Sequence, residues 1–163
     1  LVVDNVRSRN PNAIIIRASS EIYVEKPELI RGKRALVIED GPTVTHGGMS
    51  YGAGYLAARQ FQASEIVNPI KYAVGSLRST FEKFPHVTKV LPAMGYSPQQ
   101  MKELEQTINS TPADVVVSGT PIRLNGLLQI DKPAVHVRYE LKEIGLPTLE
   151  DALTDFLEGV QRK

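Results

Sequence analysis

The sequence predicts an α/β fold of the Rossmann-like type, with a mainly parallel sheet covered by helices on both faces. Six β-type runs alternate with helical segments along the chain, and this alternation is typical of βαβ units. The runs at residues 14–16 and 115–117 are continuously apolar, as in parallel strands that are buried on both faces. With 163 residues, of which 42% are apolar and 23% charged, the chain is long enough to form a globular core.

Each element follows from a local pattern. The predicted strands are residues 13–16, 35–38, 65–67, 89–91, 115–118 and 134–139. The predicted helical segments are the helix end at 1–9, a turn at 27–31, and helices at 51–61, 76–84, 98–110 and 148–160. Ser76 and Ser97 are expected to cap the helices that follow them, and Glu150 and Asp151 favour the first turn of the closing helix.

Composition excludes several classes of function. The net charge of +1 and the pI of about 8.1 give no basis for a nucleic-acid surface. Without cysteine the chain has no disulfide, thiol nucleophile or cysteine-bound metal. No apolar run reaches the roughly 18 residues of a membrane span, and no signal peptide is visible, so we expect a cytoplasmic protein. The opening residues resemble the middle of a longer protein, and we expect the chain to be a fragment.

The segment after the second predicted strand is the most informative motif. The run 35–38 ends on Glu39 and Asp40, and a loop rich in glycine, threonine and serine then leads into the predicted helix at 51–61. Glycine lets backbone N–H groups approach a ligand, and a helix N-terminus favours negative charge. We therefore predict a site for a phosphorylated ligand. Its residues are Thr43, Thr45, Gly47, Gly48 and Ser50.

Three further loops follow predicted strands, at residues 68–76, 92–97 and 119–125. In open α/β sheets, ligands bind outside the carboxyl ends of the strands. Each of these loops joins glycine to small polar residues, which include Gly75, Ser76, Gly119 and Thr120. Any one glycine could simply make a tight turn, but four such loops at one edge favour a common ligand site.

Three side chains are candidates for catalysis. Asp40 could bind Mg²⁺ together with phosphate oxygens, or it could form an Asx-type turn. His46 could donate to phosphate or act as a general acid or base, or it could be a solvated loop residue. Arg138, near the carboxyl end of the last strand, could bind phosphate through two parallel hydrogen bonds, or it could form a buried ion pair with Glu140 or Glu39.

Several nucleotide-binding and catalytic motifs are missing from the sequence. The run Gly32, Lys33, Arg34 lacks the upstream glycine and the following Ser or Thr of a P-loop, and the dinucleotide-binding glycine fingerprint is also missing. No cluster has zinc-ligand spacing, and no serine nucleophile elbow is visible. The sequence by itself therefore predicts that this chain alone does not hydrolyse ATP or GTP.

These motifs together resemble those of the cyclic 2,3-diphosphoglycerate synthetase family, whose members are often labelled predicted GTPases. The resemblance lies in residues 32–49, 72–76, 91–96, 119–121 and 137–140. It implies that the chain is the C-terminal part of such a protein. Residues 1–31 would end an upstream P-loop nucleotide-binding domain, in which Ala18 and Ser19 would belong to the base-contacting loop. Residues 32–163 would form a Rossmann-like domain.

The resemblance implies part of an ATP- or GTP-dependent phosphoryl-transfer enzyme of the ligase type, with Mg²⁺ and the nucleotide bound by the upstream domain. This chain would form the side of the site that binds the phosphorylated substrate. The alternative is a non-catalytic module that binds a phosphorylated metabolite or regulates a P-loop GTPase. Expected partners are a phosphorylated small molecule and the upstream domain, with a homo-oligomer left open; nucleic acid and membranes are not expected.

Overall fold

The computed structural model describes residues 1–95 and 97–161. The chain divides into two compact units. Unit 1 consists of Leu1–Glu21 and Glu140–Lys163, and unit 2 consists of Ile22–Tyr139. The predicted division at residue 31 concerns an upstream domain and stays a prediction.

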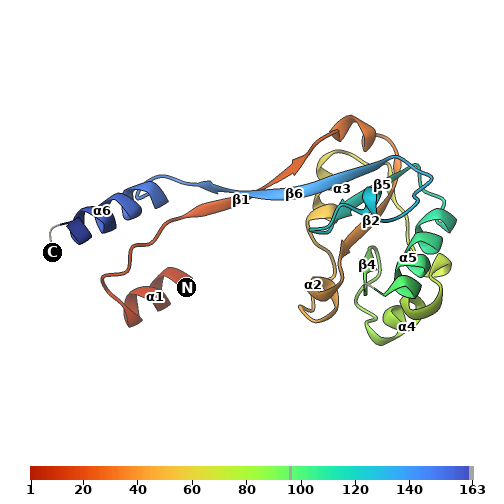
Figure 1. Ribbon diagram of the computed structural model, residues 1–163, viewed down its shortest axis with the longest axis horizontal. Coiled ribbons are helices and arrows are strands. Elements are labelled where there is room, and N and C mark those ends of the chain that lie inside the picture. The colour runs from red at the N-terminus through yellow and green to blue at the C-terminus, as the bar shows by residue number, and fades with distance from the viewer. Residues whose placement is uncertain (96, 162–163) are drawn as a thin grey trace. The chain divides into compact units, whose positions relative to one another are not determined.

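The predicted α/β fold is confirmed, with one six-stranded sheet in the order β1-β6-β5-β2-β3 and with β4 paired to β2 (Figure 1). The strands are β1 Ala18–Val24, β2 Arg34–Asp40, β3 Glu65–Ile66, β4 Leu91–Ala93, β5 Val115–Gly119 and β6 Ala134–Glu143. The helices are α1 Val2–Arg9, α2 Gly41–Thr45, α3 Ala53–Gln60, α4 Gly75–Lys83, α5 Pro98–Ser110 and α6 Leu149–Gln161. Short 3₁₀ turns lie at Pro27–Leu29, Ile70–Tyr72 and Leu124–Gly126.

The strands of unit 2 that carry the core are parallel. β2 pairs with β5 on one side and with β3 and β4 on the other, and β5 pairs with β6. β1 runs antiparallel to β6, because Ile144 N–H donates to the carbonyl of Arg17 (2.8 Å) and the Ser19 hydroxyl donates to the carbonyl of Lys142 (3.3 Å). The sheet is therefore mainly parallel with one antiparallel strand, as large α/β sheets often are.

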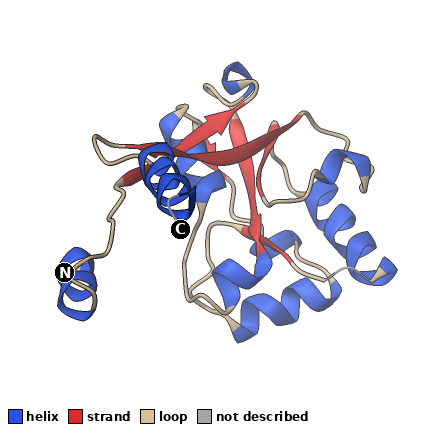
Figure 2. Cartoon of the chain, turned by 60° about the vertical axis from the view of Figure 1, so that its left-hand side comes forward, coloured by secondary structure: helices blue, strands red, loops and turns tan. Residues whose placement is uncertain are grey.

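The core lies entirely in unit 2, where helices surround the strands (Figure 2). Residues 35–38 of β2 are fully buried. Helix α3 packs against β2 and β5 on the face to which Glu39 and Gly119 point. Helix α5 lies on the opposite face, where Met101 and Leu104 reach Asp40 at the end of β2. Side chains alternate along a strand, so these two faces separate odd-numbered from even-numbered residues of β2.

Unit 1 has local structure without a buried core. None of the residues of α1 is buried. Helix α6 is capped by Thr148 and Asp151, whose side chains each accept the other's backbone N–H at 3.1 and 2.8 Å. Glu143 also accepts from Leu149 N–H at 2.6 Å. No helix in the described residues is long and apolar enough to cross a membrane.

Four expectations about elements need correction. Residues 13–16 form no strand, because they do not pair with any other strand, and Ile14 is 56% exposed. Ser76 does not cap α4, because its hydroxyl donates to Glu103 instead. Strand β4 begins at Leu91 rather than at residue 89. The sequence also gave no indication of β1 or of the short helix α2 within the glycine-rich loop.

Candidate functional site

The register of the sheet brings Asp40, Thr120 and Arg138 to one face at the carboxyl end. Ile38 pairs with Ser118, and Ser118 pairs with His136. Two residues further along the chain from these paired residues come Asp40 in β2, Thr120 directly after β5 and Arg138 in β6, a set that we call the carboxyl-end row. Asp40 also pairs with Ala93 of β4. The loops after β2, β4 and β5 therefore do meet at one edge; Tyr96 of the β4 loop lies outside the described residues.

Asp40 caps α2. Its Oδ2 accepts the Thr43 N–H at 3.2 Å and the Thr43 hydroxyl at 2.7 Å. This geometry is the Asx-type turn that the sequence allowed for Asp40. It fixes the Asp40 carboxylate against Thr43. Within the described residues, no group of three or more His, Cys, Asp or Glu side chains could hold a metal ion. Asp40 therefore fits Mg²⁺ only if a ligand supplies phosphate oxygens to the ion, as Mg²⁺ sites commonly require.

The end of α2 fixes the tautomer of His46. The buried Thr45 hydroxyl donates its single proton to the carbonyl of Gly41 at 2.7 Å. The 3.0 Å contact between Thr45 Oγ1 and His46 Nδ1 is then a hydrogen bond only when Nδ1 carries the hydrogen. The Nε2 atom of a neutral His46 is thus an acceptor, which suits a general base better than a phosphate donor.

The loop beyond His46 is exposed, as a ligand-binding loop should be, but part of it already serves α2. The N–H groups of His46 and Gly47 both donate to the carbonyl of Pro42, at 2.9 and 3.1 Å. Gly48 has a φ of +66°, a conformation that glycine adopts without strain. Gly48 and Ser50 are both exposed. Phosphate binding by this loop stays a prediction.

The N-terminus of α3 is occupied by the protein's own carboxylate. Glu39 is 2% exposed and accepts the N–H groups of Gly52, Gly54 and Tyr55 at 3.0, 3.3 and 2.8 Å. The sequence predicted that this helix N-terminus would favour an anionic ligand, but the residues predicted to bind phosphate, within 43–50, precede these three donors. Burial raises the pKa of Glu39, and the three hydrogen bonds offset only part of that shift. The helix that follows the glycine-rich loop is therefore satisfied internally.

The N-terminus of α4 has the same arrangement. The N–H of Ser76 donates to Glu103 at 2.9 Å, and the Ser76 hydroxyl donates to the same oxygen. A side chain at Gly75 would collide with the Glu103 carboxylate, and the φ of Gly75 is +53°. Hydrogen bonds from Ser76 and Gln99 lower the pKa of Glu103. Of the two residues predicted to bind phosphate in this loop, Ser76 is thus engaged by a carboxylate on α5.

Gly119 and Thr120 have separate structural tasks. A Cβ on Gly119 would collide with Glu39 and with the backbone of Gly54, so glycine permits the close approach of α3 to β5. Thr120 is 3% exposed and donates to the carbonyl of Ile122 at 2.8 Å. Thr120 also lines a small cavity of about 30 Å³ with Asp40. Of the two residues, only Thr120 belongs to the carboxyl-end row.

Arg138 is exposed, and its guanidinium lies 4.3 Å from the ring centroid of Tyr23 in a cation–π contact. The side chain is therefore not buried, as the ion-pair alternative required. Ala18 and Ser19 lie in the first residues of β1 in unit 1 rather than in a loop. Their base-contacting role stays a prediction.

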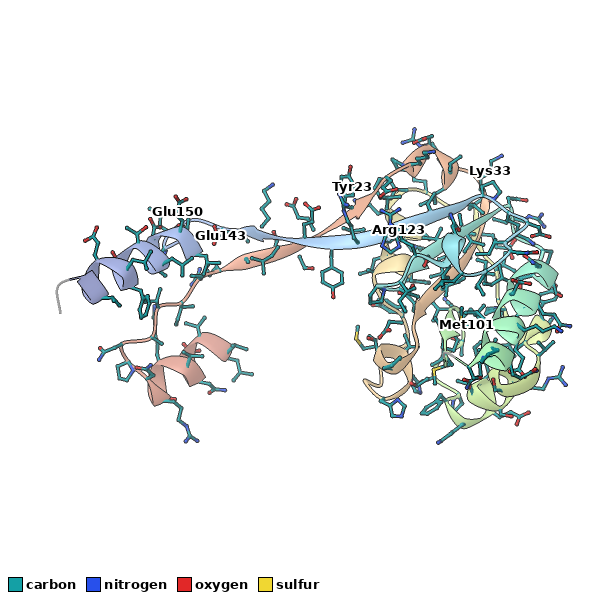
Figure 3. The ribbon with its side chains drawn as sticks, viewed as in Figure 1. Tyr23, Lys33, Met101, Arg123, Glu143 and Glu150 are labelled. Carbon is teal, nitrogen blue, oxygen red and sulfur yellow. The ribbon has the colours of Figure 1, made fainter. Side chains whose placement is uncertain are left out.

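Sequence reasoning missed a second polar cluster on the same face of unit 2. A pocket of about 200 Å³ is lined by Glu25, Ser118, Arg123 and His136, among other residues. Arg123, labelled in Figure 3, donates to Glu25 at 2.6 Å. The alternation of His136 with Arg138 along β6 was visible in the sequence. Arg123 also lies in a loop after a parallel strand, so the same edge rule could have identified it.

The geometry thus defines an α/β protein with polar side chains at the carboxyl ends of its parallel strands. Over 161 residues, 99% of the chain, it is 54% identical to a protein of Thermococcus kodakarensis named Arginine synthetase ArcE. The chain spans 36% of the length of that relative, so it is similar to one part of a larger synthetase. The relative's name does not mention cyclic 2,3-diphosphoglycerate. No protein-family model and no solved structure matches the chain.

Proposed function

We propose that this chain is the substrate-binding part of a nucleoside-triphosphate-dependent synthetase, and that the substrate group that accepts phosphate binds at the carboxyl-end row. The observation that carries the proposal is the register of β2, β5 and β6, which pairs Ile38 with Ser118 and Ser118 with His136. Asp40, Thr120 and Arg138 each follow one of these residues by two positions, which supports a common face for them. The 54% identity to a synthetase supports the class of enzyme. By the same similarity we propose arginine as the product.

The nucleotide would be bound outside this chain, because its 163 residues contain no P-loop. We propose an upstream P-loop domain that binds ATP or GTP with Mg²⁺, and we propose that Asp40 completes the coordination of the ion. A synthetase of this kind moves the terminal phosphoryl group onto a substrate oxygen, and a nitrogen nucleophile then displaces phosphate. Such catalysis depends on positioning and electrostatics.

Residues of this chain have distinct roles in that scheme. The guanidinium of Arg138 would neutralise charge on the phosphorylated oxygen. His46, with Nε2 as acceptor, would take a proton from the nucleophile. The Asp40–Thr43 cap would fix the position of the carboxylate.

The test uses the native protein that carries this chain and measures ATP formation from ADP, phosphate and L-arginine in the reverse direction. We expect Arg138→Gln to lower kcat/KM roughly ten- to a hundredfold, because a charge-assisted hydrogen bond contributes about 1.5–3 kcal/mol. Arg59→Gln is the matched control, since Arg59 is an exposed arginine in the last turn of α3.

Two results would contradict the proposal. A native protein with no arginine-dependent nucleotide turnover would overturn the assignment as a synthetase that forms arginine. Equal activity of Arg138→Gln and Arg59→Gln would remove the carboxyl-end row from the site while leaving the enzyme class intact.

A further inference from the structure

The pocket beside the carboxyl-end row is built from both polar and apolar walls. Its floor consists of β5 and β6, through Val116, Ser118 and His136, and its sides are the segment after β1 and the turn around Asn125. All of these residues belong to unit 2. At about 200 Å³ it is smaller than the pockets of drug-sized ligands. It therefore suits a small metabolite.

His136, on the floor of the pocket, carries one hydrogen-bonding atom without a partner in the described residues. Nδ1 of His136 is buried and has no hydrogen-bond partner within residues 1–95 and 97–161. Buried polar atoms nearly always have a partner, so an orphaned one points to a ligand or a water molecule. Burial and the nearby Arg123 guanidinium lower the pKa of His136, which keeps the ring neutral near pH 7.

The direction of the neighbouring hydrogen bonds uses the proton of the Ser118 hydroxyl and leaves its oxygen as an acceptor. Thr120 gives its proton to the carbonyl of Ile122, so the 3.3 Å contact between Ser118 and Thr120 requires Ser118 to donate. The remaining lone pairs of Ser118 Oγ are then available to a donor. Ser118 and His136 are paired residues of adjacent strands. A ligand above them meets one acceptor and one neutral imidazole.

Charges of both signs stand at the rim. Arg123 and Glu25 form an ion pair at 2.6 Å, with side chains 64% and 41% exposed. Lys26 lines the same pocket. The hydrogen bond from Arg123 lowers the pKa of Glu25, which is therefore ionised at neutral pH. A zwitterion matches such a rim, because its carboxylate and ammonium groups each find an opposite charge.

We propose that this pocket binds a free α-amino acid, with its carboxylate on Arg123, its ammonium on Glu25, and its side chain over Ser118 and His136. The choice of an amino acid rests on the proposed function, whereas the need for a small polar ligand rests on the pocket alone. The site lies one side-chain row from Thr120 and Arg138. An amino acid bound here would extend its side chain toward the carboxyl-end row, where we propose that the phosphoryl group is transferred.

The test titrates the chain with L-arginine and follows the imidazole resonances by NMR, with affinities from calorimetry. The chain has three histidines, His46, His86 and His136, so each ring can be assigned by substitution. Agmatine, which lacks the carboxylate, and N-acetyl-L-arginine, which lacks the ammonium, probe the two ends of the ligand. Arg123→Gln and Glu25→Gln probe the rim. Arg34→Gln is the matched control, since Arg34 forms a comparable half-exposed pair with Asp114 at 2.9 Å.

We expect L-arginine to shift the His136 resonance saturably and to bind roughly ten- to a hundredfold more weakly to Arg123→Gln than to Arg34→Gln. Both truncated ligands should also bind more weakly. Shifts confined to His46 or His86, or equal affinities of the two arginine variants, would overturn the proposal. Binding of inorganic phosphate in place of L-arginine would overturn the ligand class. No nucleotide is used, so these outcomes are independent of whether the native protein is a synthetase.

Discussion

Unit 2 and unit 1 differ in where their apolar side chains lie. Every residue of the hydrophobic core belongs to Ile22–Tyr139. Unit 1, although shorter, contains most of the large apolar side chains that are exposed in the described residues. In α6 these are Leu149, Leu153, Phe156, Leu157 and Val160, each more than half exposed. Because unit 2 contains the hydrophobic core, we expect it to fold on its own contacts. Contiguous exposed apolar surface marks interaction sites, so we expect unit 1 to be stabilised by contacts with another polypeptide.

The comparison also separates two sources of helix stability. Helices α3 and α4 of unit 2 are fixed by side chains from outside the helix, Glu39 at α3 and Glu103 at α4. Helix α6 of unit 1 is fixed by its own cap, Thr148 and Asp151. Local caps contribute less than tertiary packing does. Substitutions in unit 2 should therefore change global unfolding, and equivalent substitutions in unit 1 should not.

The largest effect is expected from Glu39→Ala. It leaves three backbone N–H groups without an acceptor inside unit 2, and each unsatisfied buried donor costs about 1–3 kcal/mol. We expect a loss of about 3–5 kcal/mol in the free energy of unfolding, measured by urea denaturation. Glu39→Gln, which keeps one acceptor oxygen, should lose less. A loss below about 1 kcal/mol for Glu39→Ala would contradict the internal anchoring of α3.

Glu39 also predicts a pH dependence. Because its pKa is raised above 4.5 in the folded chain, the folded state binds a proton more tightly than the unfolded state does. The contribution of Glu39 to the free energy of unfolding is therefore fully present below pH 4.5 and decreases as pH rises through the raised pKa. Denaturation series over this range should show the decrease in the native chain and not in Glu39→Gln. Identical slopes in the two would argue against the raised pKa.

Two leucines give a matched pair across the units. Leu36→Ala removes a fully buried side chain from β2, for which we expect a loss of about 2–5 kcal/mol. Leu153→Ala removes a side chain that is 53% exposed on α6, and we expect a change within about 0.5 kcal/mol. Calorimetric melting of both variants measures the contrast. Similar losses would mean that α6 packs as tightly as the core.

The two helix caps offer a finer version of the same test. Ser97 caps α5 in a reciprocal box with Gln100, and Ser97→Ala should lower global stability by about 1 kcal/mol. Thr148→Ala removes the corresponding cap of α6. It should speed amide hydrogen exchange in α6 and leave the melting temperature of unit 2 unchanged. A shift of that temperature by both variants would place α6 in the same cooperative unit as α5.

The smallest effect concerns the ion pair at the start of β2. The hydrogen bonds from Arg34 lower the pKa of Asp114 to about 2 from 3.8. The stability that this carboxylate contributes is present above pH 3.8 and is lost as pH falls from there toward about 2. Asp114→Asn should flatten acid unfolding in this range. An unchanged acid profile would mean that the exposed pair contributes nothing measurable, as exposed pairs often do.

The sequence predicted the parts of the fold that depend on local pattern. Continuous apolar runs identified β2 and β5, and the order Ser97, Pro98 and Gln100 identified the start of α5. Residues 13–16 have the same apolar pattern but form no strand, because a strand needs a neighbour and the pattern does not supply one.

The site was predictable to the extent that it follows the edge rule. Asp40, Thr120 and Arg138 were named from their positions after strands, and the register brings them to one face. The occupation of two helix N-termini by Glu39 and Glu103 could not be predicted, because those contacts join segments that are 13 and 27 residues apart. Glycine-rich loops look alike in sequence whether a phosphate or a carboxylate fills them.

Hydrogen–deuterium exchange of the whole chain, with and without L-arginine, tests the central claim that unit 2 both folds on its own contacts and binds the substrate. We predict the slowest exchange in β2 and β5, and fast exchange in α1 and α6. L-arginine should slow exchange around Ser118, Asn125 and His136, and leave unit 1 unchanged. Protection in α6 equal to that in β2, or no protection by L-arginine around His136, would contradict this account.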